Sequence, residues 1–425
     1  MTKVTQIMRF EISFDREIYN LLSDIQYATW RIKNKAISMA YDWQQYSFSF
    51  NERFGSYPKE KEVIGVGLKS DITKNVVEFS RNIGSAVIDE SIREALTKFK
   101  NDKNKIVRGE ISIPNYKRGG SFPIRAQSMK ELTRINTSKY TIKLSLLSKE
   151  GAKERNTTTQ QQVSLKTGRG ANVILDRIID GTYKMCDSNI SKIKTKYYLM
   201  LTYSFEAESK PTLLKSNVCG LDLGVINAAT IAFNNDRARY FIGGSEIQSF
   251  RARIEARRNA LLRQGKYCGE GRKGHGRETR LKPIEKLQGK VANFKDTTNH
   301  RYARYIVDMA VKHNCGVIQM EDLSEITKDA ERFLKSWTYY DLQTKITQKA
   351  KAVGIEVRKV APRYTSQRCS CCGYIAKENR KSQAEFKCVA CGYKTNADYN
   401  AAVNIATPNI DSIISQELAK QSEAK

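Results

Sequence analysis

The sequence predicts an α+β protein of several domains, in which a barrel-like, strand-rich N-terminal region carries a helical insertion and precedes a mixed α/β region. Its 425 residues exceed the length of a typical single domain, and 40% of them are hydrophobic, which is enough for several buried cores. The hydrophobic pattern changes from alternation to helical spacing near residue 19 and back to alternation near residue 110. A cysteine-rich segment then interrupts the C-terminal α/β pattern.

The N-terminal region opens on a strand, because Met8, Phe10, Ile12 and Phe14 recur with period two. Apolar residues then recur at helical spacing, so residues 19–104 are expected to form a small helical module. Alternating runs return after it, and we expect the opening strand to join them in one sheet. The runs that predict these later strands are 111–113, 140–147, 163–165 and 197–205.

The C-terminal region follows a polar linker, 207–216, and mixes helical with strand-like periods. Residues 218–233 predict two strands joined by a tight turn, and the run at 316–320 predicts a buried strand. The remaining predictions are helices at 246–264, 281–313, 342–353 and 397–406, a strand at 355–360 and a polar tail at 412–425.

The charge balance favours a polyanionic partner. Lys and Arg number 73 against 45 Asp and Glu, which gives a net charge of +28. Such an excess most often serves nucleic-acid binding, although a basic protein without that role remains an alternative. No run approaches the 18 or so apolar residues of a membrane span, so we expect no membrane association.

The cysteines indicate a metal module. Cys369, Cys372, Cys388 and Cys391 form two C-x-x-C pairs separated by 15 residues, a spacing that lets four thiolates close around one Zn²⁺. Cys371 is a spare, because it would leave a single residue between ligands. The odd number of cysteines and the absence of a signal-like segment predict a reducing compartment, the cytoplasm.

Three carboxylates stand at positions where an unpaired charge is costly. Asp222 lies within an apolar strand, Glu321 ends another, and Asp398 lies in the first turn of the 397–406 helix. Brought together, they would hold two Mg²⁺ ions for phosphodiester hydrolysis. Taken singly, each acid is more often a turn or cap residue.

The segments around these acids resemble the three split motifs of a RuvC-type nuclease. They are Gly220-Leu-Asp-Leu-Gly224, Gln319-Met-Glu-Asp-Leu323 and the run Asn396–Asn404 with Asp398 in it. A C-x-x-C pair before the third motif is similar to transposon TnpB proteins and type V CRISPR effectors. The chain most resembles the miniature type V-F effectors, and residues 290–296 and 364–367 also match family patterns.

The resemblance implies an RNA-guided, Mg²⁺-dependent DNA endonuclease of antiviral defence that cuts next to a short flanking motif. Asp222, Glu321 and Asp398 would be its catalytic acids, and Arg380, between the cysteine pairs, would assist them. The implied partners are a guide RNA, double-stranded and single-stranded DNA, and a second copy of the chain on one guide RNA.

The resemblance also implies a domain plan. Residues 1–18 and 105–206 would form a wedge domain that holds guide RNA, and 19–104 would be a recognition domain. Residues 217–361 and 397–425 would form an RNase H-like (RuvC) core, with a zinc-ribbon, target-nucleic-acid-binding module inserted at 362–396. Some relatives carry a further zinc site near the N-terminus, whereas no cysteine precedes Cys186 here.

Two alternatives remain open from the sequence. A transposon-encoded TnpB-type nuclease would share the chemistry and differ in the origin of its guide. A non-catalytic RNA-guided DNA-binding protein would keep the fold without cutting, although the presence of all three acids argues against it.

Overall fold

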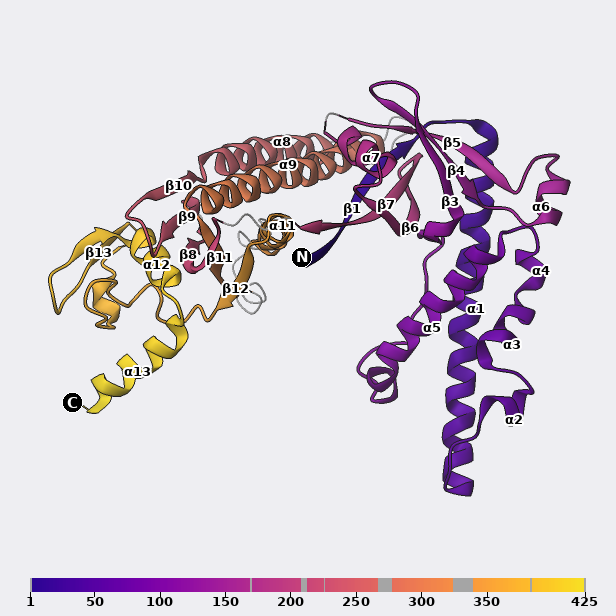
Figure 1. Ribbon diagram of the computed structural model, residues 1–425, viewed down its shortest axis with the longest axis horizontal. Helices are drawn as coiled ribbons and strands as arrows, with labels where there is room; N and C mark the ends of the chain where they lie inside the picture. Colours follow the sequence, from indigo (N-terminus) through magenta and orange to yellow (C-terminus); the bar gives the residue numbers. More distant parts are fainter. Residues whose placement is uncertain are drawn as a thin grey trace. The chain divides into compact units, whose positions relative to one another are not determined.

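The computed structural model describes residues 2–168, 170–207, 212–224, 226–266, 277–323, 339–382 and 384–423 (Figure 1). The chain divides into two compact units, an N-terminal unit of Lys3–Phe205 and a C-terminal unit that begins at Glu206. Of the expected linker, residues 208–211 lie outside the described residues, and its last three residues already belong to a strand.

A seven-stranded sheet forms the base of the N-terminal unit. The opening strand β1 (Thr2–Ile12) joins this sheet between β7 and β5, as the alternation predicts. Phe10 and Ile12 on β1 are buried with Tyr140 and Leu199 in one core. The other strands are β2 (Phe122–Ile124), β3 (Met129–Arg134), β4 (Lys139–Ser145), β5 (Gln160–Lys166), β6 (Lys184–Ile193) and β7 (Lys196–Ala207), in the order β2-β6-β7-β1-β5-β4-β3.

The helical insertion is dominated by α1 (Arg16–Phe54), the long indigo helix of Figure 1, and α5 (Ser85–Val107). Asp15 begins α1 by accepting a 3.0 Å hydrogen bond from the Ile18 amide, and Gly55 ends it at φ 70°. The shorter helices are α2 (Glu60–Ile64), α3 (Leu68–Asn75) and α4 (Val77–Ser80) in the insertion, and α6 (Lys149–Glu154) and α7 (Asn172–Ile179) within the sheet region.

The strand predicted at 111–113 is wrong, because this part of the chain is irregular. The segment that follows it is held by polar side chains of α1 instead of by a sheet. Trp30 donates a 2.7 Å hydrogen bond to the Tyr116 carbonyl, and Gln26 donates to the carbonyls of Gly119 and Gly120. Local alternation therefore misled the prediction, since the partners of this segment lie on a distant helix.

A five-stranded sheet forms the centre of the C-terminal unit. Its strands are β8 (Leu214–Asp222), β9 (Asn227–Phe233), β10 (Arg239–Gly243), β11 (Cys315–Glu321) and β12 (Glu356–Val360). They follow the order β10-β9-β8-β11-β12, in which β9 is antiparallel to both neighbours and β8, β11 and β12 are parallel. Every strand that the sequence predicts here is confirmed.

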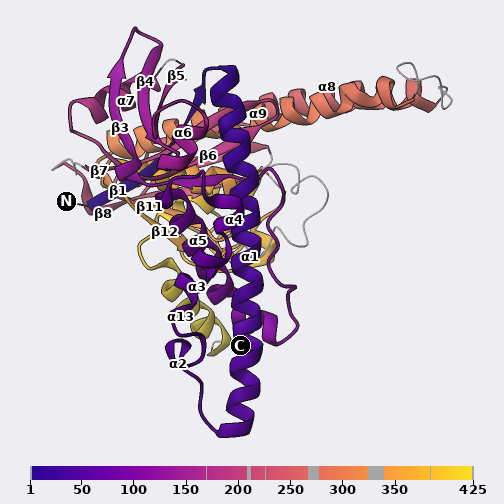
Figure 2. The same cartoon turned by 90° about the vertical axis from the view of Figure 1, so that its right-hand side faces the viewer.

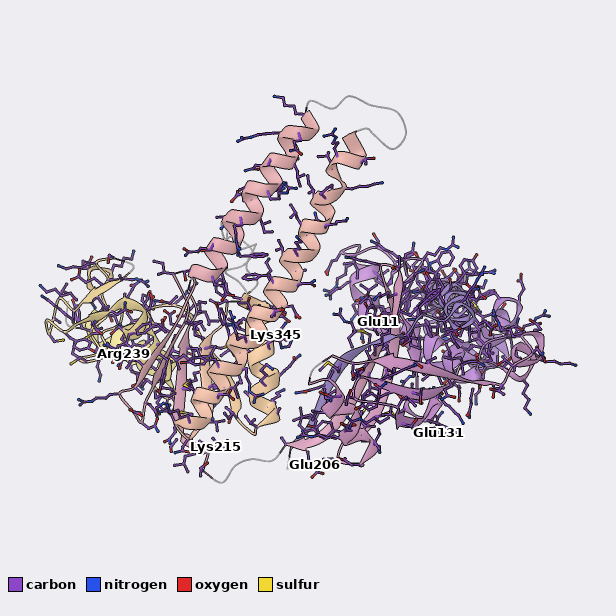
Figure 3. The ribbon with its side chains drawn as sticks, turned by 90° about the horizontal axis from the view of Figure 1, so that it is seen from above. Glu11, Glu131, Glu206, Lys215, Arg239 and Lys345 are labelled. Carbon is purple, nitrogen blue, oxygen red and sulfur yellow. The ribbon has the colours of Figure 1, made fainter. Side chains whose placement is uncertain are left out.

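Helices α9 (Arg277–Lys312) and α11 (Tyr339–Ala352) cover one face of this sheet. Lys345 of α11, labelled in Figure 3, joins the two helices through Asp296 of α9 at 3.1 Å and also pairs with Asp341 of its own helix at 2.6 Å. Helix α8 (Ser245–Lys266) pairs with α9, and the two extend away from their own sheet (Figures 1 and 2). Among the described residues, none of the helices combines the length and apolarity that a bilayer crossing requires.

The other face of the sheet carries α12 (Ala397–Ala406), and next to it lie the short strands β13 (Glu385–Lys387) and β14 (Lys394–Asn396). The predicted polar tail is wrong, because α13 (Ile410–Glu423) occupies it. Ile410 and Ile414 are buried in a small cluster with Val360 of β12, and Glu417 accepts two hydrogen bonds, of 2.7 and 2.8 Å, from Arg368.

Candidate active site

The alternation of strands β8 and β11 directs two acids to the face that α12 covers. Leu221 and Met320 belong to the apolar core beneath α9 and α11, so the residues after them, Asp222 and Glu321, point to the opposite face. Met320 pairs with Leu221 across the parallel ladder. Glu321 therefore follows in register beside Asp222 at the ends of the two strands.

Helix α12 brings the third acid to the same place. Gly220 allows this close approach, because a Cβ there would lie only 2.3 Å from the Ala402 carbonyl oxygen and from the Ala406 amide. Asp398, Ala402 and Ala406 are spaced by four residues and share one side of the helix. The contact at Gly220 thus aims Asp398 at the end of β8.

The three acids form one electrostatic unit. Burial, and then the charges of Glu321 and Asp398, raise the pKa of Asp222 to about 8. Burial also raises the pKa of Glu321, against the opposing effects of Thr365 and Arg380. The Arg380 guanidinium lies 3.7 Å from Asp398 Oδ1. The four residues proposed from the sequence for this site are therefore neighbours.

Further side chains beside these acids were not identified in the sequence analysis. Thr365 Oγ1 donates a 2.6 Å hydrogen bond to Glu321 Oε1, and Asn227 Nδ2 donates one of 2.9 Å to Asp398 Oδ2. The Tyr339 hydroxyl donates to the Gly224 carbonyl at 2.9 Å, and burial together with the charge of Asp222 raises the pKa of Tyr339 to about 12. Thr365 lies within the 364–367 segment that matched a family pattern, whereas Asn227 has no sequence signal.

The donor set suits a hard divalent cation. Its ligating atoms are carboxylate oxygens, the type that Mg²⁺ prefers. Among the residues that the structure describes, one arginine, about a third exposed, faces the three carboxylates, so the buried negative charge exceeds the positive charge beside it. A cation would relieve the repulsion that raises the pKa of Asp222.

The cysteine segment forms a second candidate metal centre. The sulfur atoms of Cys369, Cys372, Cys388 and Cys391 all lie within 4.8 Å of one another, a group that could hold one metal ion. The two halves repeat the same turn, since the Gly373 and Gly392 amides donate to the carbonyls of Cys369 and Cys388 at 2.9 and 3.0 Å. Cys371 is exposed and outside this group, as expected.

The cysteine module is connected to the acid site through helix α12 and through Arg380. Strand β14 runs directly into α12, and Asn400 and Asn404 of that helix each donate a 2.8 Å hydrogen bond to the Arg368 carbonyl, one residue before Cys369. Arg380 reaches Asp398 from between the two cysteine pairs. Folding of the module therefore fixes both Asp398 and the cation beside it.

Comparison with known proteins gives consistent matches. The sequence profile of the Cas12f1-like TNB domain matches residues 339–405, which contain the cysteine module and Asp398. The CRISPR-associated endodeoxyribonuclease Cas12f1 of Sulfoacidibacillus thermotolerans is 44% identical over 95% of this chain and 96% of its own length. That of Syntrophomonas palmitatica is 38% identical over 85% of this chain and 80% of its own.

A solved structure shares the fold. The cryo-EM structure of a Cas12f1-sgRNA-target DNA complex contains a chain that aligns with 93% of this one and 84% of its own length. Its TM-score is 0.68 at 24% sequence identity.

Proposed function

The chain belongs to the Cas12f1 family of CRISPR-associated endodeoxyribonucleases, and we propose that Asp222, Glu321 and Asp398 form its single DNA-cutting site. The enzyme is an RNA-guided endonuclease, so base pairing with the guide selects the DNA. The observation that carries the proposed site is the convergence of three acids from β8, β11 and α12 beside Arg380. The strand order β10-β9-β8-β11-β12 supports an RNase H-like (RuvC) core.

Each residue of the site has a distinct role in this proposal. Two Mg²⁺ ions held by the three carboxylates would activate water and stabilise the leaving oxygen of the phosphodiester. Thr365 bonds to Oε1 of Glu321 and Asn227 to Oδ2 of Asp398, so Oε2 of Glu321 would face a cation, whereas Oδ1 of Asp398 would be shared between a cation and Arg380. Arg380 contributes positive charge for the DNA phosphate.

The cysteine module is a structural zinc ribbon in this proposal, because four thiolates close the coordination shell and leave no open position for chemistry. Cys388→Ser should lose zinc and cleavage together, because Arg380 and Asp398 depend on the ribbon. Cys371→Ser, its control, should keep both. Metal analysis and a plasmid assay on the two variants check this, and full zinc content in Cys388→Ser would contradict it.

The rest of the chain handles nucleic acid. We assign residues 1–18 and 105–206 to a guide-RNA-holding wedge domain, 19–104 to recognition of the heteroduplex and of a short flanking DNA motif, and 362–396 to target binding. A net charge of +28 suits a protein that contacts guide RNA, duplex DNA and displaced single strand at once. Two copies on one guide RNA, in the prokaryotic cytoplasm, complete the proposal.

The direct test is cleavage of a guide-matched plasmid by the purified ribonucleoprotein. Wild type should cut with Mg²⁺ and not with EDTA, and Asp222→Ala should bind the plasmid without cutting it. Asp308→Asn is the matched control, since Asp308 is an exposed acid on α9 that pairs with Arg304 at 3.1 Å. Cutting by Asp222→Ala at the wild-type rate would refute the site.

The transposon alternative is tested by sequencing the RNA that co-purifies with the chain. We expect a repeat-spacer guide, because the 44% identity to a CRISPR-associated relative extends over 95% of the chain. RNA from a transposon end would favour the TnpB-type reading instead.

A further inference from the structure

A pocket opens in the N-terminal unit where strand β1 passes into helix α1. Its cavity volume is about 120 Å³, below the range of drug-sized ligand pockets and far too small for a duplex. Buried apolar side chains, Ile12, Leu22 and Tyr197, form its floor. The pocket thus offers an apolar surface against which one planar ring system can pack.

Aromatic rings border this floor. Phe14 is 75% exposed although it lies at the pocket. Its ring centroid is 5.7 Å from that of Tyr19, which in turn meets Tyr197 edge-on at 5.2 Å. An exposed phenylalanine gains little from folding, but it provides a stacking surface for a nucleobase.

Polar groups complete the pocket. The Ser13 hydroxyl is buried and has no hydrogen-bond partner among the residues that the structure describes. Two lysines stand at the rim, where Glu11 (labelled in Figure 3) lies 2.8 Å from Lys196 and 3.7 Å from Lys166. Asp15 is a second carboxylate of the lining, so Glu11 and Asp15 balance the two lysines, and Lys192, 4.8 Å from the Tyr19 ring centroid, gives these five groups one cation in excess.

We propose that this pocket binds one unpaired nucleotide of the guide RNA. The base stacks on Phe14 and Tyr19, the Ser13 hydroxyl bonds to the base edge, and Lys166 and Lys196 neutralise the adjoining phosphate. RNA is the source that fits, because its loops and bulges present single splayed bases that proteins take up on aromatic side chains. The inference rests on the proposed function, since it requires a guide RNA.

Ultraviolet crosslinking of the full chain with its co-purified guide RNA, followed by tryptic mass spectrometry, tests the location. Trypsin releases residues 10–16 as one peptide, in which Phe10 is buried and Phe14 exposed. We expect a ribonucleotide adduct on Phe14. The absence of an adduct there, while other peptides crosslink to the guide, would overturn the proposal.

Guide-RNA affinity gives the second readout. Phe14→Ala should weaken binding about 5- to 100-fold, the range for losing one stacked base, and Phe14→Tyr should bind like wild type. Ile7→Ala is the matched control, because Ile7 is 64% exposed on β1, the strand that precedes Phe14, and lies outside the pocket. Equal affinity of Phe14→Ala and wild type overturns the pocket alone, whereas a wild-type chain that binds no guide RNA refutes the proposed function.

Discussion

The two faces of the C-terminal sheet differ although they come from the same strands. Beneath α9 and α11, Leu221, Ile318 and Met320 are fully buried among apolar side chains. Beneath α12, the alternate residues of β8 and β11 are Gly220, Asp222, Gln319 and Glu321. One face stabilises the unit, and the other holds charges that burial disfavours.

The difference shows how a small domain can contain a buried cluster of acids: apolar burial on one face offsets the free-energy cost of burying charged groups on the other. The apolar face contributes the free energy of folding, while the α12 face depends on individual polar contacts such as Gln319 Nε2 donating to the Ile405 carbonyl at 2.7 Å. Substitutions on the two faces should therefore separate stability from cleavage.

The largest effect is expected from Asp222→Asn. Cleavage of a guide-matched plasmid should fall by about 10³-fold or more, because the site loses a metal-binding carboxylate. The unfolding temperature of the same variant, measured by calorimetry in EDTA, should rise, because the folded state no longer has to take up a proton or bury a carboxylate at this position. A variant that cuts normally, or that is markedly less stable in EDTA, would contradict the assignment.

The stability gain in Asp222→Asn should depend on pH. The folded protein raises the pKa of Asp222 from 3.8 to about 8, so the folded state binds this proton more tightly than the unfolded state. Metal-free wild type should therefore lose stability as the pH rises from 4 towards 8. The amide does not titrate, so the gain should be larger at pH 9 than at pH 6, and a pH-independent gain would contradict the shift.

Ile318→Ala, on the opposite face, should destabilise the C-terminal unit by about 2–5 kcal/mol through the cavity that it leaves. Chemical denaturation measures this loss. At a temperature where the variant is folded, plasmid cleavage should stay within a few-fold of wild type, and a selective loss of cleavage would show that the two faces are not separable.

Gly220→Ala tests the contact between the sheet and α12. Its new Cβ would meet the backbone of α12 at 2.3 Å, so we expect a loss of about 1–3 kcal/mol together with slower cleavage as Asp398 shifts. Gly243→Ala is the control, since nothing lies within 4 Å of its Cβ position. Equal unfolding temperatures for the two variants would argue against the close packing of α12.

The smallest effect is expected from Thr365→Val, which removes the 2.6 Å hydrogen bond to Glu321. Cleavage should slow about 10-fold and the Mg²⁺ concentration needed for half-maximal rate should rise, because Glu321 loses its orientation. Thr365→Ser keeps the hydroxyl and should restore both values. An unchanged Mg²⁺ dependence in Thr365→Val would remove Thr365 from the site.

Local patterns in the sequence predicted many of the strands and helices and the cysteine group. Alternation identified β1, a buried run identified β11, helical spacing identified α12, and the cysteine spacing identified the four sulfur atoms that the structure brings together. Helix α13 was not predicted from the sequence, because few of its residues, among them Ile410 and Ile414, are buried and the segment is otherwise mostly polar.

The contacts that orient the acids could not be predicted, because they join distant positions. Asn227 and Asp398 are 171 residues apart, and Thr365 and Glu321 are 44 apart. Such pairs follow from the packing of α12 and of the cysteine module against the sheet, which no local pattern encodes.

Met320 and Glu321 are neighbours on β11 that face opposite sides of the sheet, and comparing them tests the account most directly. The measurement is the unfolding temperature and the plasmid cleavage rate of Met320→Ala and Glu321→Gln in parallel. We predict that Met320→Ala unfolds at a lower temperature yet cuts, and that Glu321→Gln is at least as stable as wild type yet does not cut. Cleavage by Glu321→Gln at the wild-type rate would contradict the central claim that this face is the cutting site.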